Sequence, residues 1–204
     1  MTGSAHVPPI KGVRADSVSR EVTASGSLSF DARSSTAGVM HEEMLKISAI
    51  TRAEIDSIKA LWQGLNSHHL AKTTHFKEHF SNLTFERRIE ALNKRDRLLV
   101  YVAQEHCESV GYCITTVDGS MGEIDSLFVK AAYRGQGVGE KLVTRALKWL
   151  EEQGCETVRV SIAEGNEQVL DFYRRFGFAE RFIVMEKPHN LPSAADSAKA
   201  GRRR

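Results

Sequence analysis

Three glycines fall within five positions in the run Arg134-Gly135-Gln136-Gly137-Val138-Gly139. The run follows a strand-like apolar stretch and precedes residues 138–150, whose apolar side chains have the spacing of an amphipathic helix. Glycine lets backbone amides approach a ligand closely, and a helix start adds unpaired N–H donors and a partial positive charge. The run therefore predicts a strand-to-helix turn that either binds a phosphate group or is a tight turn without a ligand.

Two other glycine-rich motifs do not fit this spacing. A Walker sequence requires Lys-Ser/Thr after its last glycine, whereas Glu140-Lys141-Leu142 follows here. A dinucleotide fingerprint requires glycine where Glu140 stands. Both alternatives fail on spacing.

Hydrophobic periodicity predicts the element order β-α-α-β-β-β-α-β-α-β. The predicted strands cover residues 44–50, 98–103, 109–116, 122–130, 157–162 and 178–185. A helix opens at a capping box, Thr51 to Glu54, and further helices cover residues 76–93, 138–150 and 167–176. This order predicts an α/β (α+β) protein with a central mixed, mostly antiparallel sheet and helices on both faces.

Composition and charge narrow the class of protein. With 204 residues, 41% of them hydrophobic and 26% charged, the chain has the size and composition of one soluble domain. We expect that domain at residues 44–188, a flexible leader or expression remnant at 1–43, and a flexible basic tail at 189–204. Residues 44–188 hold twenty Lys/Arg and twenty Asp/Glu, so they lack the net positive field that nucleic-acid binding needs.

Membrane and disulfide chemistry are not indicated either. No stretch approaches the about 20 apolar residues of a membrane helix. The three cysteines are odd in number and form no CxxC pair, which argues against a disulfide framework and a thiolate zinc site. A reducing, cytoplasmic setting fits this cysteine usage best.

Two motifs resemble the GNAT superfamily of acetyl-CoA-dependent N-acetyltransferases. The phosphate turn of that family reads Gln/Arg-x-x-Gly-x-Gly/Ala, and Arg134-x-x-Gly137-x-Gly139 matches it. Further on, the family has Asn, then Tyr seven residues later, then Gly-Phe, which here are Asn166, Tyr173 and Gly177-Phe178. The resemblance covers about residues 44–187, and it implies a GNAT-type fold, in agreement with the element order.

The resemblance implies where acetyl-CoA, the expected co-substrate, would bind. Its pyrophosphate would lie against the amides of Gly135, Gln136, Gly137, Val138 and Gly139, with Arg134 nearby. Its pantetheine arm would pair with the backbone of Phe128 and Val129, and the Phe128 amide would meet the oxyanion. Asn166 would touch the cofactor, or would only cap the following helix.

Acetyl transfer to an amine also requires proton transfers. An amine with a pKa near 10.4 is mostly protonated at pH 7, so its nucleophilic form costs about 4 to 5 kcal/mol. The resemblance implies Glu123 as general base, acting through water, and Tyr173 as the general acid for the departing thiolate. Strand alternation puts Asp125 on the same face as Glu123, where it would bind the cationic amine. The alternatives are that Glu123 and Asp125 are only solvated or paired with Arg or Lys, and that Tyr173 only packs on other apolar side chains.

The remaining candidates are four histidines and a tryptophan. His75 and His79 have the i, i+4 spacing of metal ligands, but no further residues complete a recognisable set, so we expect no metal. His68, His69, His75, His79 and Trp62 fall where the family shapes its acceptor pocket. Trp62 and a histidine there would line that pocket, or the histidines would lie on a surface helix.

The sequence thus predicts an N-acetyltransferase that moves acetyl from acetyl-CoA to a primary amine of a small metabolite by direct attack in a ternary complex. The alternatives are a protein N-terminal or lysine acetyltransferase, and an acyl-CoA-binding sensor without turnover. Exposed late strands favour a homodimer. The amine acceptor and the acyl-chain preference are not encoded in these motifs.

Overall fold

One five-stranded sheet organises the domain. The computed structural model describes residues 45–188; the leader expected at 1–43 and the tail expected at 189–204 lie outside the described residues. The strands are β1 (Leu45–Ile50), β2 (Arg97–Glu105), β3 (Glu108–Asp118), β4 (Met121–Val129) and β5 (Thr157–Val160). They lie in the order β1-β2-β3-β4-β5, with antiparallel pairing up to β4 and parallel pairing between β4 and β5.

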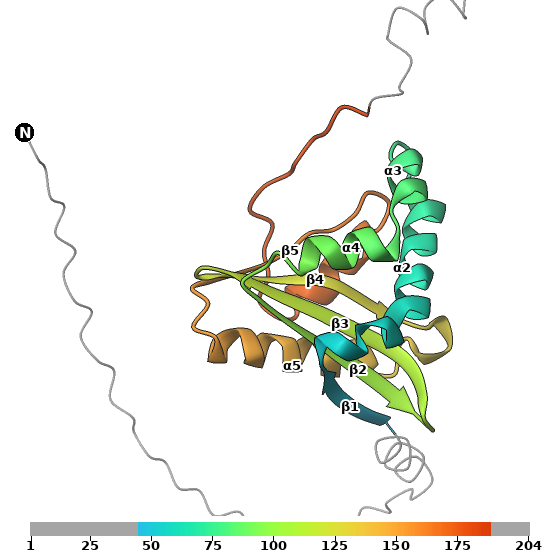
Figure 1. Ribbon diagram of the computed structural model, residues 1–204. Coiled ribbons are helices and arrows are strands. Elements are labelled where there is room, and N and C mark those ends of the chain that lie inside the picture. Colours follow the sequence, from blue (N-terminus) through green and yellow to red (C-terminus); the bar gives the residue numbers. More distant parts are fainter. Residues whose placement is uncertain (1–44, 189–204) are drawn as a thin grey trace, which may run out of the picture.

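Helices cover both faces of this sheet, as the sequence predicts (Figure 1). On one face lie η1 (Arg52–Ile58), α2 (Lys59–Lys72) and α4 (Phe85–Leu92), and α3 (Lys77–Asn82) joins α2 to α4. On the other face lie α5 (Val138–Glu152) and α6 (Leu170–Arg174). The short turns η2 (Ala131–Tyr133) and η3 (Glu167–Val169) precede α5 and α6.

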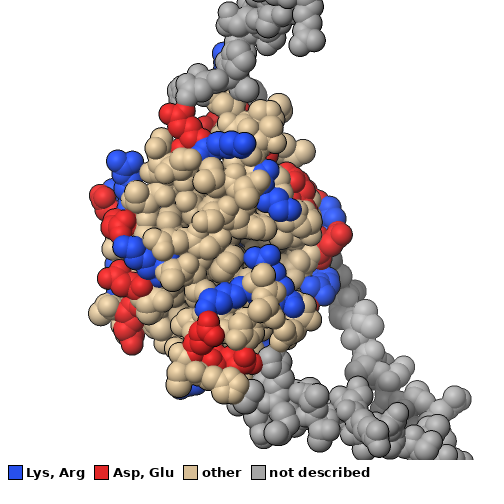
Figure 2. Space-filling model, turned by 90° about the vertical axis from the view of Figure 1, so that its right-hand side faces the viewer, with Lys and Arg blue, Asp and Glu red and all other residues tan. Residues whose placement is uncertain are grey.

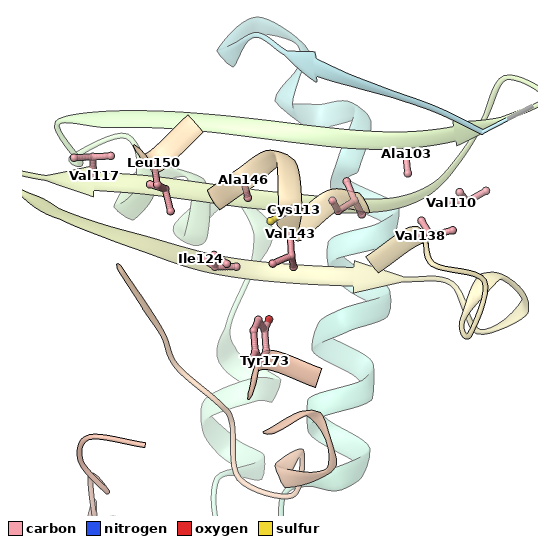
Figure 3. Packing of buried hydrophobic residues seen from close by; sticks show 11 residues of the cluster. Ala103, Val110, Cys113, Val117, Ile124, Val138, Val143, Ala146, Leu150 and Tyr173 are labelled. Atoms are coloured by element: carbon pink, nitrogen blue, oxygen red, sulfur yellow. The ribbon is translucent and has the colours of Figure 1, made fainter. Parts of the chain in front are cut away.

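Each face has its own hydrophobic core. The α5 core is built from fully buried Leu142, Val143, Ala146 and Leu150 against strand residues such as Cys113 and Ile124. Figure 3 shows Val143, Ala146 and Leu150 of the helix beside Cys113 and Ile124 of the sheet. The α2 core joins Ile58, Leu61 and Trp62 to Phe85 of α4 and to Val100, Tyr112 and Ile114. Successive side chains along β2 and β3 point to opposite faces of the sheet, so each strand contributes buried residues to both cores.

An irregularity in β4 matters for the site. The register with β3 runs from Thr115 opposite Ile124 to Ile114 opposite Ser126, so Asp125 has no partner of its own in β3. This is a β-bulge, which re-aims the extra side chain and bends the strand. The bulge falls immediately after Ile124 and Val160, the last residues that β4 and β5 pair.

Most predicted elements are confirmed, with shifted ends. The helix predicted over 76–93 is two helices, because the chain breaks at Leu83 and Thr84, and the Thr84 hydroxyl accepts a hydrogen bond from the Arg87 amide of α4 at 3.3 Å. The predicted capping box is present at the start of the 3-10 turn η1. There the Glu54 carboxylate accepts a hydrogen bond from the Thr51 amide at 2.9 Å.

The strand predicted over 178–185 is wrong. Phe178 is held by α6, since its amide donates to the Tyr173 carbonyl at 3.3 Å and its ring packs on the Tyr173 ring. Beyond it the chain pairs with none of the described strands, and the side chains of Phe182, Ile183, Val184 and Met185 are 76–92% exposed. Aromatic and β-branched residues favour strands only where a sheet edge receives them.

Gly165 fixes the loop after β5 against the end of α2, which gives a stability prediction. Its φ is +80°, and a Cβ there would lie 2.5 Å from the Lys72 carbonyl oxygen. We expect Gly165→Ala to lower the free energy of unfolding by about 2–4 kcal/mol, because left-handed strain of about 1–2 kcal/mol adds to a backbone clash. Gly177→Ala, at φ +84° with no heavy atom within 4 Å, carries the strain alone. Equal losses in urea unfolding would contradict this account.

Candidate active site

The glycine run forms the predicted turn between β4 and α5. Gly135 and Gly137 have φ of +75° and +77°, which L side chains rarely adopt, and Gly137 is the N-cap residue of α5. No side chain caps this helix start. A 15-residue helix thus begins with free amide donors and the positive end of its dipole, an arrangement suited to an anion such as a diphosphate.

Arg134, at the start of the run, folds back on β4. Its Nε donates to the Val129 carbonyl at 2.9 Å, and its guanidinium lies 5.6 Å from the centre of the Phe128 ring. The Gln136 side chain donates to the Ala132 carbonyl at 2.8 Å, which closes the turn. Figure 2 views the side of the molecule on which α2 and the glycine turn lie, and there Lys and Arg side chains gather beside a hollow.

The separation of β4 from β5 opens a cavity of about 110 Å³ in the sheet. β4 contributes residues 124–127, and the end of β5 with the chain that follows contributes residues 160–163. Leu65 and His69 of α2 line it as well, together with Asn166, Val169, Phe172 and Tyr173. The cavity is therefore reached by side chains from both layers of the domain.

Tyr173 of α6 lies at this cavity and also packs in the α5 core. Its side chain is 7% exposed, and Figure 3 shows its hydroxyl directed towards β4. The rings of Phe172 and Phe178 pack edge-to-face on it at 5.1 and 5.7 Å. Burial raises the pKa of the Tyr173 phenol, so the hydroxyl keeps its proton throughout the neutral pH range. A protonated phenol can donate to a thiolate.

Asn166 makes a contact that neither alternative in the sequence foresaw. Its side chain does not cap η3. Its Oδ1 accepts from Gln168 at 2.7 Å and lies 3.3 Å from Nε2 of His68 on α2. The residue thus joins the loop after β5 to the helix across the cavity.

Glu164 secures the same junction. One of its carboxylate oxygens accepts from the Thr73 hydroxyl at 2.5 Å and from the amides of Thr74 and His75 at 3.1 Å, and the other meets the His75 ring. These bonds lower the pKa of Glu164 to about 2. The loop that carries Asn166 is therefore fastened to the end of α2, which fixes that wall of the cavity.

Glu123 lies at the edge of the site rather than in the cavity lining. Its side chain is 14% exposed and faces two guanidinium groups, that of Arg159 at 3.3 Å and that of Arg95 at 3.8 Å. The hydroxyl of Ser161, a cavity residue, donates to its carboxylate at 3.4 Å. Glu123 is thus connected to the cavity through one hydroxyl group.

Asp125, at the bulge, is directed into the site. Its side chain is 2% exposed, and its Oδ2 pairs with the Arg88 guanidinium of α4. Burial raises the pKa of the Asp125 carboxyl, and the charge of Arg88 opposes that rise. Its other oxygen, Oδ1, is buried and has no hydrogen-bond partner among residues 45–188.

Sequence reasoning named His69 only among the histidines of the expected acceptor pocket, and it missed Ser161. His69 lies four positions after Leu65, which continues the apolar face of α2, so this histidine faces inward. Trp62, expected to line the pocket, is instead 5% exposed in the α2 core, edge-to-face with Phe85 at 5.7 Å.

His75 and His79 belong to no group of metal-binding side chains in the described part of the chain. Within that part, every helix is too short or too polar to cross a bilayer.

Comparison with known proteins shows which family has this sequence and which proteins are similar to it. Residues 62–178 match the sequence model of the Acetyltransferase (GNAT) family. A 93-residue segment is 36% identical to the N-alpha-acetyltransferase MAK3 of Arabidopsis thaliana, covering 40% of this chain and 49% of that one. A 100-residue segment is 28% identical to an uncharacterized N-acetyltransferase of Methanocaldococcus jannaschii, covering 46% and 44%. The matched segments span about half the length of these relatives.

Solved structures share the fold. An aminoglycoside acetyltransferase from an uncultured soil metagenomic sample, in complex with sisomicin, superimposes with a TM-score of 0.55 at 20% identity, covering 74% of this chain and 99% of that one. The aminoglycoside N-acetyltransferase AAC(6')-Iy in complex with CoA gives 0.51 at 17% identity, covering 72% and 95%. At these identities the likeness concerns the fold alone.

Proposed function

Because the chain belongs to the Acetyltransferase (GNAT) family, we propose that it is an acetyl-CoA-dependent N-acetyltransferase acting on a primary amine of a small metabolite. The observation that carries the proposal is the opening of the sheet after Ile124 and Val160, with Tyr173 on the cavity that results. The phosphate-binding turn lies at the end of the same strand, β4. The strand β4 thus runs from the cavity, where Tyr173 of α6 lies, to the turn proposed to bind the diphosphate.

The residues present fit coenzyme A. The amides of residues 135–139 and the α5 N-terminus would hold the pyrophosphate, with Arg134 beside them. Phe128 and Val129 lie beyond the last β4–β5 pair, so their backbone on that side is open to the pantetheine arm. Asn166 lies where it would contact the same arm. When bound, acetyl-CoA supplies the acetyl thioester.

The proton transfers are assigned to Tyr173, which lines the cavity, and to Glu123, which is connected to the cavity through Ser161. The ammonium gives up a proton through Ser161 to the Glu123 carboxylate, its general base. The nitrogen then bonds to the acetyl carbon as the C–S bond breaks, and the Tyr173 hydroxyl donates its proton to the departing sulfur. The second proton that the nitrogen loses restores the Tyr173 phenol. Direct attack holds both substrates in one complex, and orientation of that kind supplies roughly 7–11 kcal/mol of the barrier reduction.

Glu123 provides a kinetic prediction. Glu123→Gln is expected to lower kcat by about 10²–10⁴-fold near neutral pH, the usual contribution of a general base. The rate should recover as pH rises, because more of the amine then arrives already deprotonated. Glu86→Gln, which breaks an exposed pair with Lys59 at 2.6 Å, is the matched control. A pH-rate profile of both variants decides the role: parallel profiles would remove Glu123 from the mechanism.

A protein acceptor is the second candidate. The similarity to an N-alpha-acetyltransferase over 93 residues favours it, whereas aminoglycoside acetyltransferases share the fold. A sensor that binds acyl-CoA without turnover is the third, and the presence of Tyr173 at the cavity argues against it.

A thiol-release assay separates these functions. Purified protein is incubated with acetyl-CoA and polyamines, amino acids, aminoglycosides and a lysine peptide in turn. We expect turnover with a small amine. Preference for the peptide would favour the second function. Coenzyme A binding without release of thiol from any amine would favour the sensor.

Two further observations support a proposal about the setting and assembly of the enzyme. Three free cysteines, one of them fully buried, suit a reducing cytoplasm. The exposed residues Phe182 to Met185 suit pairing with a second copy of the chain, and we propose a homodimer on that ground. Light scattering of the intact protein gives its mass directly, and a monomer at every concentration would contradict the dimer.

A further inference from the structure

Two buried acceptor atoms at the cavity take no part in the proton transfers assigned above. They are Oδ1 of Asp125 on β4 and Nδ1 of His69 on α2, two residues of the cavity lining. Each is inaccessible to solvent and has no hydrogen-bond partner among residues 45–188. The hydroxyl oxygen of Ser126, which also belongs to the lining, is likewise buried without a partner in that part of the chain, and a hydroxyl can donate as well as accept. A buried polar atom without a hydrogen-bond partner lowers the stability of the fold by about 1–3 kcal/mol. A ligand that donates to both acceptor atoms would remove that cost.

Asp125 offers half of its carboxylate. Arg88 holds Oδ2, which fixes the side chain and balances its charge, while Oδ1 remains for another donor. The bulge gives this residue its direction, because Asp125 is the extra residue of β4 at that point. A cationic donor satisfies a buried carboxylate oxygen best.

His69 offers an acceptor nitrogen held in place by packing. Its ring stacks on Phe80 with centroids 5.2 Å apart and planes at 30°. Burial lowers the pKa of His69, and the neighbouring His68 adds to that effect, so the imidazole is neutral at neutral pH. A neutral imidazole with its hydrogen on Nε2 accepts at Nδ1.

These two atoms come from different elements, which suggests two donor groups on one acceptor molecule. Resting on the function proposed above, we infer that the acceptor is a primary amine with a second hydrogen-bond donor. Its reacting ammonium donates to Oδ1 of Asp125, and its second donor, an ammonium or a hydroxyl, donates to Nδ1 of His69. The acceptor class is thus diamines and amino alcohols rather than simple alkylamines.

The rest of the lining suits such a molecule. Leu65 and Leu127 present apolar side chains, which accommodate methylene groups between two polar ends. The cavity of about 110 Å³ holds the equivalent of about four waters at roughly 30 Å³ each, so an acceptor enclosed between the two atoms must be small. A compact chain of a few carbons meets these limits.

Matched amines test the inference by kinetics. The wild-type enzyme is assayed with α,ω-diaminoalkanes and ω-amino alcohols of three to six carbons, and with n-alkylamines of equal length. The value of kcat/KM should be about 10- to 100-fold higher for the diamine of optimal length, the effect of one hydrogen bond donated by an ammonium, and up to about 10-fold higher for the amino alcohol, whose hydroxyl is neutral. A preference for diamines alone would identify the second donor as an ammonium.

Three variants assign the effect to the two atoms. His69→Leu should reduce the ratio of diamine to alkylamine kcat/KM to about one, and Asp125→Asn should raise KM for both amines by about 10- to 100-fold. His79→Leu is the control, since His79 packs on the same Phe80 ring at 5.1 Å but does not line the cavity. That variant should keep the wild-type ratio.

A spectroscopic measurement on the wild-type protein covers the case in which a variant fails to fold. Protein with ¹⁵N-labelled histidine and bound coenzyme A is titrated with 1,4-diaminobutane and with n-butylamine. The Nδ1 resonance of His69 should move only with the diamine. Equal responses to both amines, an unchanged ratio in His69→Leu, or no diamine binding or turnover at all would overturn the inference. Turnover of other amines in that event would leave the proposed function intact.

Discussion

Tyr173→Phe is expected to lower kcat by about 10²–10⁴-fold, the usual contribution of a positioned acid. The variant keeps the ring that packs on Phe172 and Phe178, so stability should change little. Coenzyme A affinity should also be unchanged, because the role proposed for the hydroxyl is to protonate the departing sulfur rather than to bind the diphosphate. Steady-state kinetics combined with calorimetric binding of coenzyme A measures both quantities.

The pH behaviour adds a second test of Tyr173. Burial raises the pKa of its phenol above the ordinary value near 10, so the donor form is present below that pH and is lost only above it. A fall in wild-type kcat between pH 7 and 9 therefore cannot arise from this group. Tyr101→Phe, which alters a tyrosine packed against the same core but absent from the cavity lining, is the matched control. Equal effects of the two changes would reduce Tyr173 to a packing residue.

Gly137→Val is expected to weaken coenzyme A binding by at least about 100-fold. A Cβ at φ +77° strains the turn by about 1–2 kcal/mol, and the side chain projects beside the amides that begin α5. Calorimetric titration with coenzyme A measures the loss. Each charge-assisted hydrogen bond to phosphate contributes about 1.5–3 kcal/mol, so disturbing two of them accounts for the expected change.

Gly119→Val is the control that separates the effect of backbone strain from the effect of lying at the start of α5. Gly119 has φ +57° in the β3–β4 turn, and a Cβ there would meet no heavy atom within 4 Å. Both valines carry left-handed strain, but only the one at position 137 lies at the helix start. Similar coenzyme A affinities for the two variants would mean that the glycine turn does not hold the diphosphate.

The elements that bring the site together were predictable because their signals are local. Glycines 135 and 137 require positive φ, and the apolar spacing from Val138 to Leu150 specifies the helix that follows. Alternating apolar and polar residues predict the strands β2 and β3, which pair antiparallel. The two motifs of the GNAT resemblance imply that β5 crosses over to lie beside β4. Apart from the pairing of β5 with β4, which followed from the resemblance, each of these features is decided by residues close together in the chain.

The features that the sequence did not provide depend on contacts between distant segments. The bulge at Asp125 exists only in register with β3, and the Ser161 to Glu123 bond joins residues 38 positions apart. The inward direction of His69 depends on how α2 crosses the opening between β4 and β5. Strand propensity at residues 178–185 was misleading, because propensity does not supply a neighbouring sheet edge.

Backbone amide shifts on coenzyme A binding test the central claim most directly. A ¹⁵N-labelled sample of the intact chain is titrated with coenzyme A, and with pantetheine, which lacks the diphosphate. The account predicts that coenzyme A produces its largest amide shifts at residues 135–139, and that pantetheine leaves those amides unmoved while shifting Phe128 and Val129. Coenzyme A binding that leaves the amides of Gly135, Gly137 and Gly139 unperturbed, or no binding at all, would contradict it.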